Sequence, residues 1–362
     1  MTTLSQLADA GPPPRVLIVR MGAMGDVLHA MPAVTALREL RPDASIGWVI
    51  EPRWLPLLRT SDADTRGDAM PLVDTTYLAA SREWKRHPLS PETLASIAVL
   101  KRVLCAEHFD LCVDMQGLIR TAVVGKMAGA QKFVGRAMPR EAPARWLYGE
   151  RVQTTAPHVI EQGCELLGAA AGAALKPASI RLPVDEAAEA SLTKKLGGDV
   201  PFVFLAPTAG WGAKEWPASR YGAVASELAR AGFRVLVNAS SHEDATAQAV
   251  VQASGGAASA IPCTMPELIA LARRTALVIA GDTGPLHLAA AFGRPVVGLY
   301  GPTDPARTGP YATQSRVLRH ASSETNHSRH SSTEAGLMQI TVDEVVEAAF
   351  ELLRGGEDRV VE

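Results

Sequence analysis

Short apolar strands that alternate with helices restrict the fold of this chain more than any other feature. Residues 15–20 (RVLIVR) have the pattern of a buried strand, and a helical stretch at 26–40 follows. The second half repeats this arrangement, with a strand at 202–206 and a helix at 218–231. Such alternation predicts parallel, doubly wound sheets. We therefore expect an α/β protein with two Rossmann-like domains that face each other.

The remaining predicted elements continue the alternation. In the first half we expect strands at 45–51 and 111–114 and helices at 91–108 and 158–167. In the second half we expect strands at 234–238, 277–280 and 296–299 and helices at 243–254, 266–274 and 286–292. Residues 320–334 are rich in Ser, His and Thr, which predicts a loop.

The domain boundary is expected where the chain changes character, at 170–183. This Ala- and Gly-rich stretch ends in Leu182-Pro183, so we expect domains at 15–182 and 183–338 after a disordered tail at 1–14. The last segment, 339–362, holds an amphipathic helix at 341–353. Thr341 is its expected N-cap and Glu344 its third residue. We expect this helix to pack back toward the N-terminal domain.

Composition narrows the class of protein. With 362 residues, 47% hydrophobic content and a net charge of −2, the chain suits two full cores and has no general affinity for nucleic acid. Basic residues recur between Arg82 and Arg151, which indicates either an anionic partner or a solvated face. No signal peptide, apolar span or CxxC pair is present in the sequence. These features favour a cytoplasmic location.

The turn from Gly281 to His287 is the clearest candidate binding site. A β-branched strand stops in Gly-Asp-Thr-Gly, and a small-residue helix follows at once. A helix N-terminus offers backbone N–H groups and a positive dipole end to an anion. The turn therefore predicts a phosphate-bearing ligand. His287, beside an apolar helix face, suits a structural role better than a catalytic one.

Two further clusters follow strands of the second half. Lys214 lies between a Gly-containing loop and a helix, where neutralising a phosphate and simple solvent exposure are equally good interpretations. Glu243 follows the strand at 234–238, at the edge of the sheet where ligands bind. From the residues alone, Glu243 is better interpreted as a helix-start acid favoured by the helix dipole.

The first strand leads into Met21-Gly22-Ala23-Met24-Gly25-Asp26. By position alone, Asp26 is better interpreted as a helix N-cap than as a catalytic group. The turn is not GxGxxG, although Glu51 ends the next strand as a ribose-binding acid would. Asp62-Ala63-Asp64 matches a metal-binding DxD pattern, which we attribute to chance because no strand precedes it. HExxH, GxSxG and P-loop patterns are absent from the sequence.

Four segments together resemble the ADP-heptose:lipopolysaccharide heptosyltransferases, glycosyltransferase family 9. They are GAMGDVLH at 22–29, DMQGL at 114–118, KEWP at 214–217, and GDTGPLH at 281–287 with GPTDP at 301–305. The resemblance covers nearly the whole chain and implies the GT-B fold, two Rossmann-like domains facing across a cleft. The domain at 15–182 would then bind the acceptor, and that at 183–338 the nucleotide sugar. The sequence at 24–29 (MGDVLH) most resembles that of members that add the first heptose.

The resemblance also implies roles for individual residues. Asp26 matches the general base, and Lys214 matches the lysine that steadies the donor diphosphate. These assignments reverse the positional interpretations of Asp26 and of Glu243, which matches a ribose-binding acid. The other implied donor-binding residues are Thr208, Asp282, Thr283, Gly284 and His287. For the acceptor we expect Gly22, Ala23, Arg120 and Arg136.

The implied reaction is an inverting transfer of heptose from ADP-heptose to the Kdo-lipid A inner core of lipopolysaccharide. Asp26 would take the acceptor proton, while Lys214 and N–H groups around Thr283 would stabilise the leaving ADP. No metal and no cofactor are expected. Because the acceptor lies in a membrane, we expect the protein to dock peripherally on the inner face of the inner membrane. We also expect a monomer. Closure of the two domains would assemble the site.

Two departures from the family pattern leave alternatives open. The family often has Ser in the first turn, where this chain has Gly22 and Ala23, and residues 320–334 match nothing in the pattern. The alternatives are a member of the same family with another donor or acceptor, and a GT-B nucleotide-sugar epimerase. A NAD-dependent oxidoreductase using Glu51 and a regulatory nucleotide-binding protein without activity are further alternatives.

Overall fold

A computed structural model describes residues 13–198, 200–326 and 331–357. Contacts divide the chain into two units, Met1–Val184 and Asp185–Glu362, which we describe separately. This division lies two residues beyond the expected boundary. Most of the expected tail, residues 1–12, lies outside the described residues. None of the helices in the described ranges has both the length and the apolar character that a membrane span requires.

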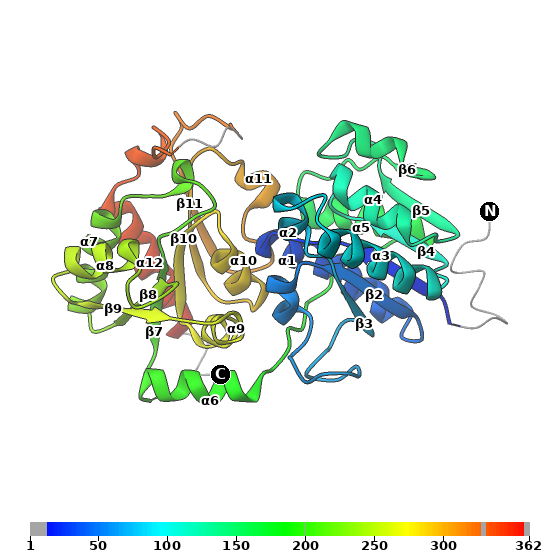
Figure 1. The fold of residues 1–362 in the computed structure, drawn as a ribbon. Helices are drawn as coiled ribbons and strands as arrows, with labels where there is room; N and C mark the ends of the chain where they lie inside the picture. The colour runs from blue at the N-terminus through cyan, green and yellow to red at the C-terminus, as the bar shows by residue number, and fades with distance from the viewer. Residues whose placement is uncertain (1–12, 199, 327–330, 358–362) are drawn as a thin grey trace. The chain divides into compact units, whose positions relative to one another are not determined.

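The first unit is a six-stranded parallel sheet in the order β3-β2-β1-β4-β5-β6 with helices on both faces (Figure 1). Its strands are β1 (Arg15–Val19), β2 (Ser45–Ile50), β3 (Thr75–Leu78), β4 (Leu111–Asp114), β5 (Lys132–Arg136) and β6 (Glu150–Val152). Its helices are α1 (Met24–Leu40), η2 (Pro52–Leu57), α2 (Ser81–Arg86), α3 (Pro91–Ala106), α4 (Ile119–Met127), η3 (Ala142–Trp146) and α5 (Val159–Ala171).

The second unit repeats the topology, with the strand order β12-β11-β10-β7-β8-β9. Its strands are β7 (Phe202–Ala206), β8 (Arg234–Ala239), β9 (Ala258–Pro262), β10 (Leu277–Gly281), β11 (Val296–Tyr300) and β12 (Ser315–Arg319). Its helices are α6 (Glu186–Leu196), η4 (Gly212–Lys214), α7 (Ala218–Arg230), α8 (Ala245–Ala253), α9 (Met265–Arg274), α10 (Gly284–Ala291), α11 (Pro305–Thr308), η5 (Leu337–Gln339) and α12 (Val342–Glu357).

Both sheets therefore have the strand order of a Rossmann fold. In each unit the first strand, β1 or β7, lies between its successor and the fourth strand, β4 or β10. Ligands of doubly wound sheets bind at this point of reversal, beyond the carboxyl ends of the strands. The topology thus predicts two ligand-binding positions, one at the loops after β1 and β4 and the other at the loops after β7 and β10.

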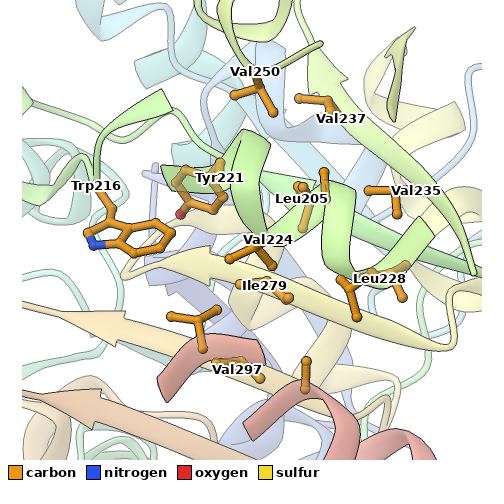
Figure 2. Packing of buried hydrophobic residues seen from close by; sticks show 14 of the residues in the cluster. Leu205, Trp216, Tyr221, Val224, Leu228, Val235, Val237, Val250, Ile279 and Val297 are labelled. Atoms are coloured by element: carbon orange, nitrogen blue, oxygen red, sulfur yellow. The ribbon is translucent and has the colours of Figure 1, made fainter. Parts of the chain in front are cut away.

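One large hydrophobic core holds the second unit together (Figure 2). Leu205, Ile279 and Val297 from the sheet pack against Tyr221 and other residues of α7, and each of these side chains is almost completely buried. Burial of one such side chain contributes about 1.5–3 kcal/mol to folding. This core fixes the strands whose ends carry the candidate site.

The last helix, α12, belongs to this same core. Thr341 Oγ1 accepts a hydrogen bond from the backbone N–H of Glu344 at 3.3 Å, and the Glu344 carboxylate accepts one from the Thr341 N–H at 2.7 Å. This is the expected capping box. Val345, Ala349 and other apolar residues of α12 are buried in the core of the second unit. The helix therefore packs on its own unit, whereas the sequence predicts packing toward the first domain.

Candidate functional site

Asp26 lies in the first turn of α1, at the edge expected for a ligand in the first unit. The helix begins at Met24 after Ala23, so Asp26 is its third residue and makes no N-cap hydrogen bond; that positional interpretation is wrong. Instead its Oδ1 lies 2.9 Å from Arg20 Nη2, and its Oδ2 lies 2.8 Å from Arg140 Nη1. Each oxygen of the carboxylate thus contacts one guanidinium group.

These two arginines determine the ionisation of Asp26. Burial alone would raise the pKa of its carboxyl group, but the charges of Arg20 and Arg140, with the Arg140 hydrogen bond, lower the pKa to about 2. The carboxylate is therefore ionised at neutral pH, which is the form that accepts a proton. Sequence reasoning missed both arginines as site residues.

The segment after β4 holds the turn that carries Asp26. Gln116 Oε1 accepts a hydrogen bond from Met21 N at 2.9 Å, and its Nε2 donates to Gly22 O at 2.7 Å. Asp114, fully buried, accepts from the backbone N–H groups of Gln116 and Gly117 and from Tyr148 Oη at 2.8 Å. The Asp-x-Gln-Gly pattern thus braces the first turn from the neighbouring strand.

A steric contact explains why this chain lacks a serine at Gly22. A Cβ atom built there would lie 2.5 Å from Trp54 Nε1, closer than real side chains approach. The Trp54 indole therefore occupies the space that a hydroxyl-bearing side chain at this position would need. Any ligand contact from Gly22 must come from its backbone.

The other basic candidates lie elsewhere in the first unit. Arg120 is exposed on the first turn of α4. Arg136 ends β5, and its Nη1 donates to Gln162 Oε1 at 2.9 Å. Glu51, at the end of β2, is buried and accepts a hydrogen bond from the Ser81 hydroxyl. Neither Arg120 nor Arg136 forms the contact with Asp26 that Arg140 makes.

In the second unit, Lys214, Asp282 and His287 form a compact charged cluster at the edge of the sheet. Lys214 Nζ lies 2.5 Å from Asp282 Oδ2 and 4.3 Å from the centre of the Trp211 ring. His287 Nε2 lies 2.9 Å from Asp282 Oδ1. Each oxygen of Asp282 therefore contacts one of these two side chains.

Electrostatics and packing both support this arrangement. Burial alone would raise the pKa of Asp282, but the hydrogen bonds and charges of His287 and Lys214 hold that pKa well below its usual range. A Cβ atom at Gly281 would lie 2.8 Å from the Lys214 carbonyl oxygen. The glycine thus allows the loop carrying Lys214 to approach the end of β10.

Two buried hydroxyl groups lie on turns at the same edge of the sheet. Thr283 is the N-cap residue of α10, and its side chain makes no capping hydrogen bond. The hydroxyls of Thr283 and of Thr303, in the turn after β11, are buried and lack a hydrogen-bond partner in the described part of the chain. Together with the N-terminus of α10 at Gly284, they provide donors for an anionic ligand.

Thr208 and Glu243 follow the neighbouring strands β7 and β8. The N-cap of α8 is Asp244, which accepts from Thr246 N and Ala247 N at 3.1 Å, so Glu243 is not needed to cap the helix. The Glu243 side chain is exposed, and no partner for its carboxylate is found among the described residues. It is available to bind hydroxyl groups at this edge.

The loop at 320–334 packs onto the Lys214 loop where it is described. Thr333 Oγ1 donates to Glu215 O at 2.8 Å, and Glu334 N donates to Ala213 O at 3.2 Å. The Glu334 carboxylate in turn accepts from Ser323 Oγ at 3.1 Å. This segment therefore supports the loop that presents Lys214.

Asp62 of the DxD pattern accepts a hydrogen bond from Thr60, and no cluster suited to a metal ion occurs among the described residues.

Comparison with known proteins shows the family to which this chain belongs. The model of glycosyltransferase family 9 (heptosyltransferase) matches residues 97–338. Lipopolysaccharide heptosyltransferase 1 of Salmonella typhimurium is 28% identical over 301 residues, covering 82% of this chain and 91% of the relative. The Escherichia coli K12 protein of the same name is 28% identical over 311 residues, covering 84% and 93%.

A solved structure with a similar fold is also that of a heptosyltransferase. Escherichia coli heptosyltransferase WaaC with ADP-2-deoxy-2-fluoro heptose has a TM-score of 0.73 and 25% identity, covering 93% of this chain and 99% of that one. This likeness and the two parallel sheets confirm the predicted α/β class, two Rossmann-like domains of GT-B type. The chain belongs to glycosyltransferase family 9, the heptosyltransferases, and is a glycosyltransferase.

Proposed function

We propose that this protein transfers heptose from ADP-heptose to the Kdo-lipid A inner core of lipopolysaccharide. The observation that carries the proposal is that each unit has a charged site at the point where its strand order reverses. An ionised carboxylate, Asp26, follows β1, and the buried Lys214–Asp282 ion pair joins the loops after β7 and β10. The relatives named for lipopolysaccharide heptosyl transfer support the choice of donor and acceptor.

The proposed reaction is a single displacement that inverts the anomeric carbon. An acceptor hydroxyl oxygen attacks that carbon, and Asp26 accepts the hydroxyl proton. The bond between the sugar and ADP breaks, and its electron pair leaves with the diphosphate. Lys214 and the N–H groups at Thr283 and Gly284 stabilise this negative charge. In this reaction Asp26 of the first unit acts on the acceptor, and Lys214 of the second unit acts on the donor.

The remaining donor contacts follow from the order of strands. Thr208 after β7 is assigned to the diphosphate, and Glu243 after β8 to the ribose hydroxyls. Asp282 is assigned to hold Lys214 and His287 in place. A family member with another donor sugar or acceptor is the alternative, because the side chains described here recognise a nucleoside diphosphate more clearly than a particular sugar.

The proposal includes metal independence, because Lys214 and the α10 N-terminus supply the charge stabilisation that a divalent ion gives other transferases. We expect the initial rate with ADP-heptose and Kdo-lipid A to be unchanged in excess EDTA. Parallel reactions with UDP- and GDP-sugars should give no product. Loss of activity in EDTA that added Mg²⁺ restores would refute metal independence, and transfer from UDP-sugars alone would refute the donor.

A second part of the proposal is peripheral docking of a cytoplasmic monomer on the inner membrane. The neighbouring elements α3, α4 and η3 carry exposed apolar residues, Trp146 among them at 70% exposure. We name this the α3–α4 surface; its other exposed apolar residues are Leu94, Val99, Val103, Ile119 and Val123, and its exposed basic residues are Lys101, Arg102, Arg120, Lys126 and Arg145. Such a mixture suits an anionic lipid surface.

Replacement of Trp146 by serine should weaken binding of the protein to phosphatidylglycerol vesicles about 10- to 100-fold, because transfer of a large apolar side chain from water into the lipid contributes about 1.5–3 kcal/mol. Sedimentation with vesicles of phosphatidylglycerol or phosphatidylcholine measures this effect. Val317→Ser, which removes an exposed apolar residue from β12, is the matched control. Equal binding by wild type to both lipids would argue against the α3–α4 surface as an anionic-lipid contact.

A further inference from the structure

The two arginines that contact the Asp26 carboxylate differ in how firmly they are held. The Arg20 side chain is 9% exposed, and besides its ion pair it donates from Nε to Asp26 O at 2.9 Å and from Nη1 to Met115 O. The Arg140 side chain is 50% exposed, and Asp26 Oδ2 is its one acceptor within the described ranges. Arg20 is thus a fixed part of the turn, whereas the Arg140 side chain can leave without breaking another hydrogen bond to the described residues.

The backbone beside Arg140 stays anchored when its side chain moves. Glu141 N donates to Gly117 O at 2.9 Å, and the Glu141 carboxylate accepts from Ile119 N at 2.7 Å. Exposed ion pairs are weak, and a guanidinium group binds carboxylates and phosphates through two parallel hydrogen bonds. Rotation of the Arg140 side chain is therefore enough to exchange Asp26 for another anion.

While Arg140 is in place, both oxygens of Asp26 accept hydrogen bonds from guanidinium groups, and an acceptor hydroxyl must compete for them. We infer that Arg140 is an exchangeable counter-ion, which an anionic group of the acceptor draws away from Asp26, so that the acceptor itself frees the base. The inference rests on the proposed role of Asp26. Kdo-lipid A carries both a sugar carboxylate and phosphates, and either chemistry could take the guanidinium group.

The charges around Asp26 give this exchange a direction. Arg20 just after β1, Arg140 from the segment after β5 and His29 from α1 all lower the pKa of the Asp26 carboxyl group, against the effect of burial. Departure of Arg140 raises that pKa, while Arg20 keeps the carboxylate ionised and oriented. A carboxylate with a higher pKa is a stronger base toward the acceptor hydroxyl.

The test compares wild type, Arg140→Gln and Arg140→Lys on three acceptors. These are Kdo-lipid A, its Kdo carboxyl methyl ester, and its dephosphorylated form. On intact Kdo-lipid A, Arg140→Gln should lower kcat/KM for the acceptor about 10- to 100-fold, as loss of a charged hydrogen bond does. On the acceptor lacking the relevant anion, Arg140→Gln should equal or exceed wild type. Arg140→Lys should recover part of the loss on the intact acceptor.

The pH profile provides a readout that a merely structural role would not move. Because Arg140→Gln removes a positive charge, the acid limb of kcat/KM should shift upward by about one pH unit or more. Arg230→Gln, which breaks an exposed arginine–glutamate pair on α7, is the matched control and should leave the acid limb unchanged.

Each outcome separates this inference from the proposed function. Loss of the Arg140 effect on only one modified acceptor supports the exchange and identifies the carboxylate or the phosphate as its source. Equal losses on all three acceptors, or an unshifted acid limb, would overturn the exchange while leaving Asp26 as the base. A wild-type enzyme that transfers no heptose to intact Kdo-lipid A would instead refute the proposed function.

Discussion

Replacement of Asp26 by asparagine should lower kcat for transfer about 10²- to 10⁴-fold, the usual contribution of a positioned general base. Asparagine keeps the size of the side chain and an oxygen that accepts from one of the arginines, but it cannot take up the acceptor proton. Binding of ADP-heptose should change little, because the proposed donor contacts lie in the second unit. Initial rates and equilibrium binding of the donor measure the two effects separately.

Asp43→Asn is the matched control for this variant, because Asp43 lies in the exposed turn after α1, where it forms an ion pair with Arg41. Thermal unfolding of both variants checks that loss of the Asp26 charge beside Arg20 has not unfolded the protein. A folded Asp26→Asn enzyme with near-normal kcat would remove Asp26 as the base. A large loss of donor affinity would assign Asp26 a binding role.

Replacement of Lys214 by methionine should lower kcat about 10²- to 10³-fold, as loss of one group that stabilises developing charge does in other enzymes. Methionine keeps much of the apolar stem against Trp211 but removes the ammonium group. The Asp282 carboxylate would then lose the ammonium group that balances its charge, which further opposes binding of a diphosphate. Rates at saturating ADP-heptose separate this effect on kcat from an effect on KM.

Two comparisons sharpen the interpretation of the Lys214 variant. Lys194→Met removes an exposed lysine from α6 and should leave the rate unchanged. Lys214→Arg keeps the positive charge and should recover part of the activity. If Lys214→Met raised only the KM for the acceptor, the lysine would not act on the leaving group.

Strands with a continuous apolar pattern could be predicted to within one residue, whereas the remaining strands were not recognised. The bounds predicted for β4 and β7 are those observed, since both are continuous apolar runs bounded by turn residues. The strands not predicted are β3 (TTYL), β5 (KFVGR), β6 (ERV), β9 (ASAIP) and β12 (SRVLR), because each is short and interrupts its apolar residues with polar or small ones. Their position depends on pairing with a neighbour, which local pattern does not reveal.

The candidate site shows the same division between local and tertiary information. The Gly281–His287 turn and Lys214 could be found because strand ends and helix starts have local signatures. The contact between Arg140 and Asp26 joins residues 114 positions apart, and the segment that carries Arg140 has no distinctive pattern. Arg20 directly follows the apolar strand β1, and the direction of its side chain depends on the segment after β4, where Met115 O accepts its hydrogen bond.

The position of Asp26 within its helix could not be predicted for a related reason. Capping preferences favoured Asp26 as the N-cap, but α1 starts two residues earlier, after Ala23, without a polar cap. Gln116 accepts a hydrogen bond from Met21 N and donates one to Gly22 O, and these bonds hold the turn in place of a capping side chain. Tertiary support thus replaced the local signal that the sequence argument relied on.

The configuration of the new glycosidic bond tests the account most directly. After reaction of the wild-type protein with ADP-heptose and Kdo-lipid A in EDTA, the product is isolated and its anomeric configuration is determined by NMR. A single displacement with Asp26 as base predicts one added heptose whose configuration is opposite to that in the donor. A product that retains the donor configuration, or release of ADP without any heptosylated product, would contradict the account.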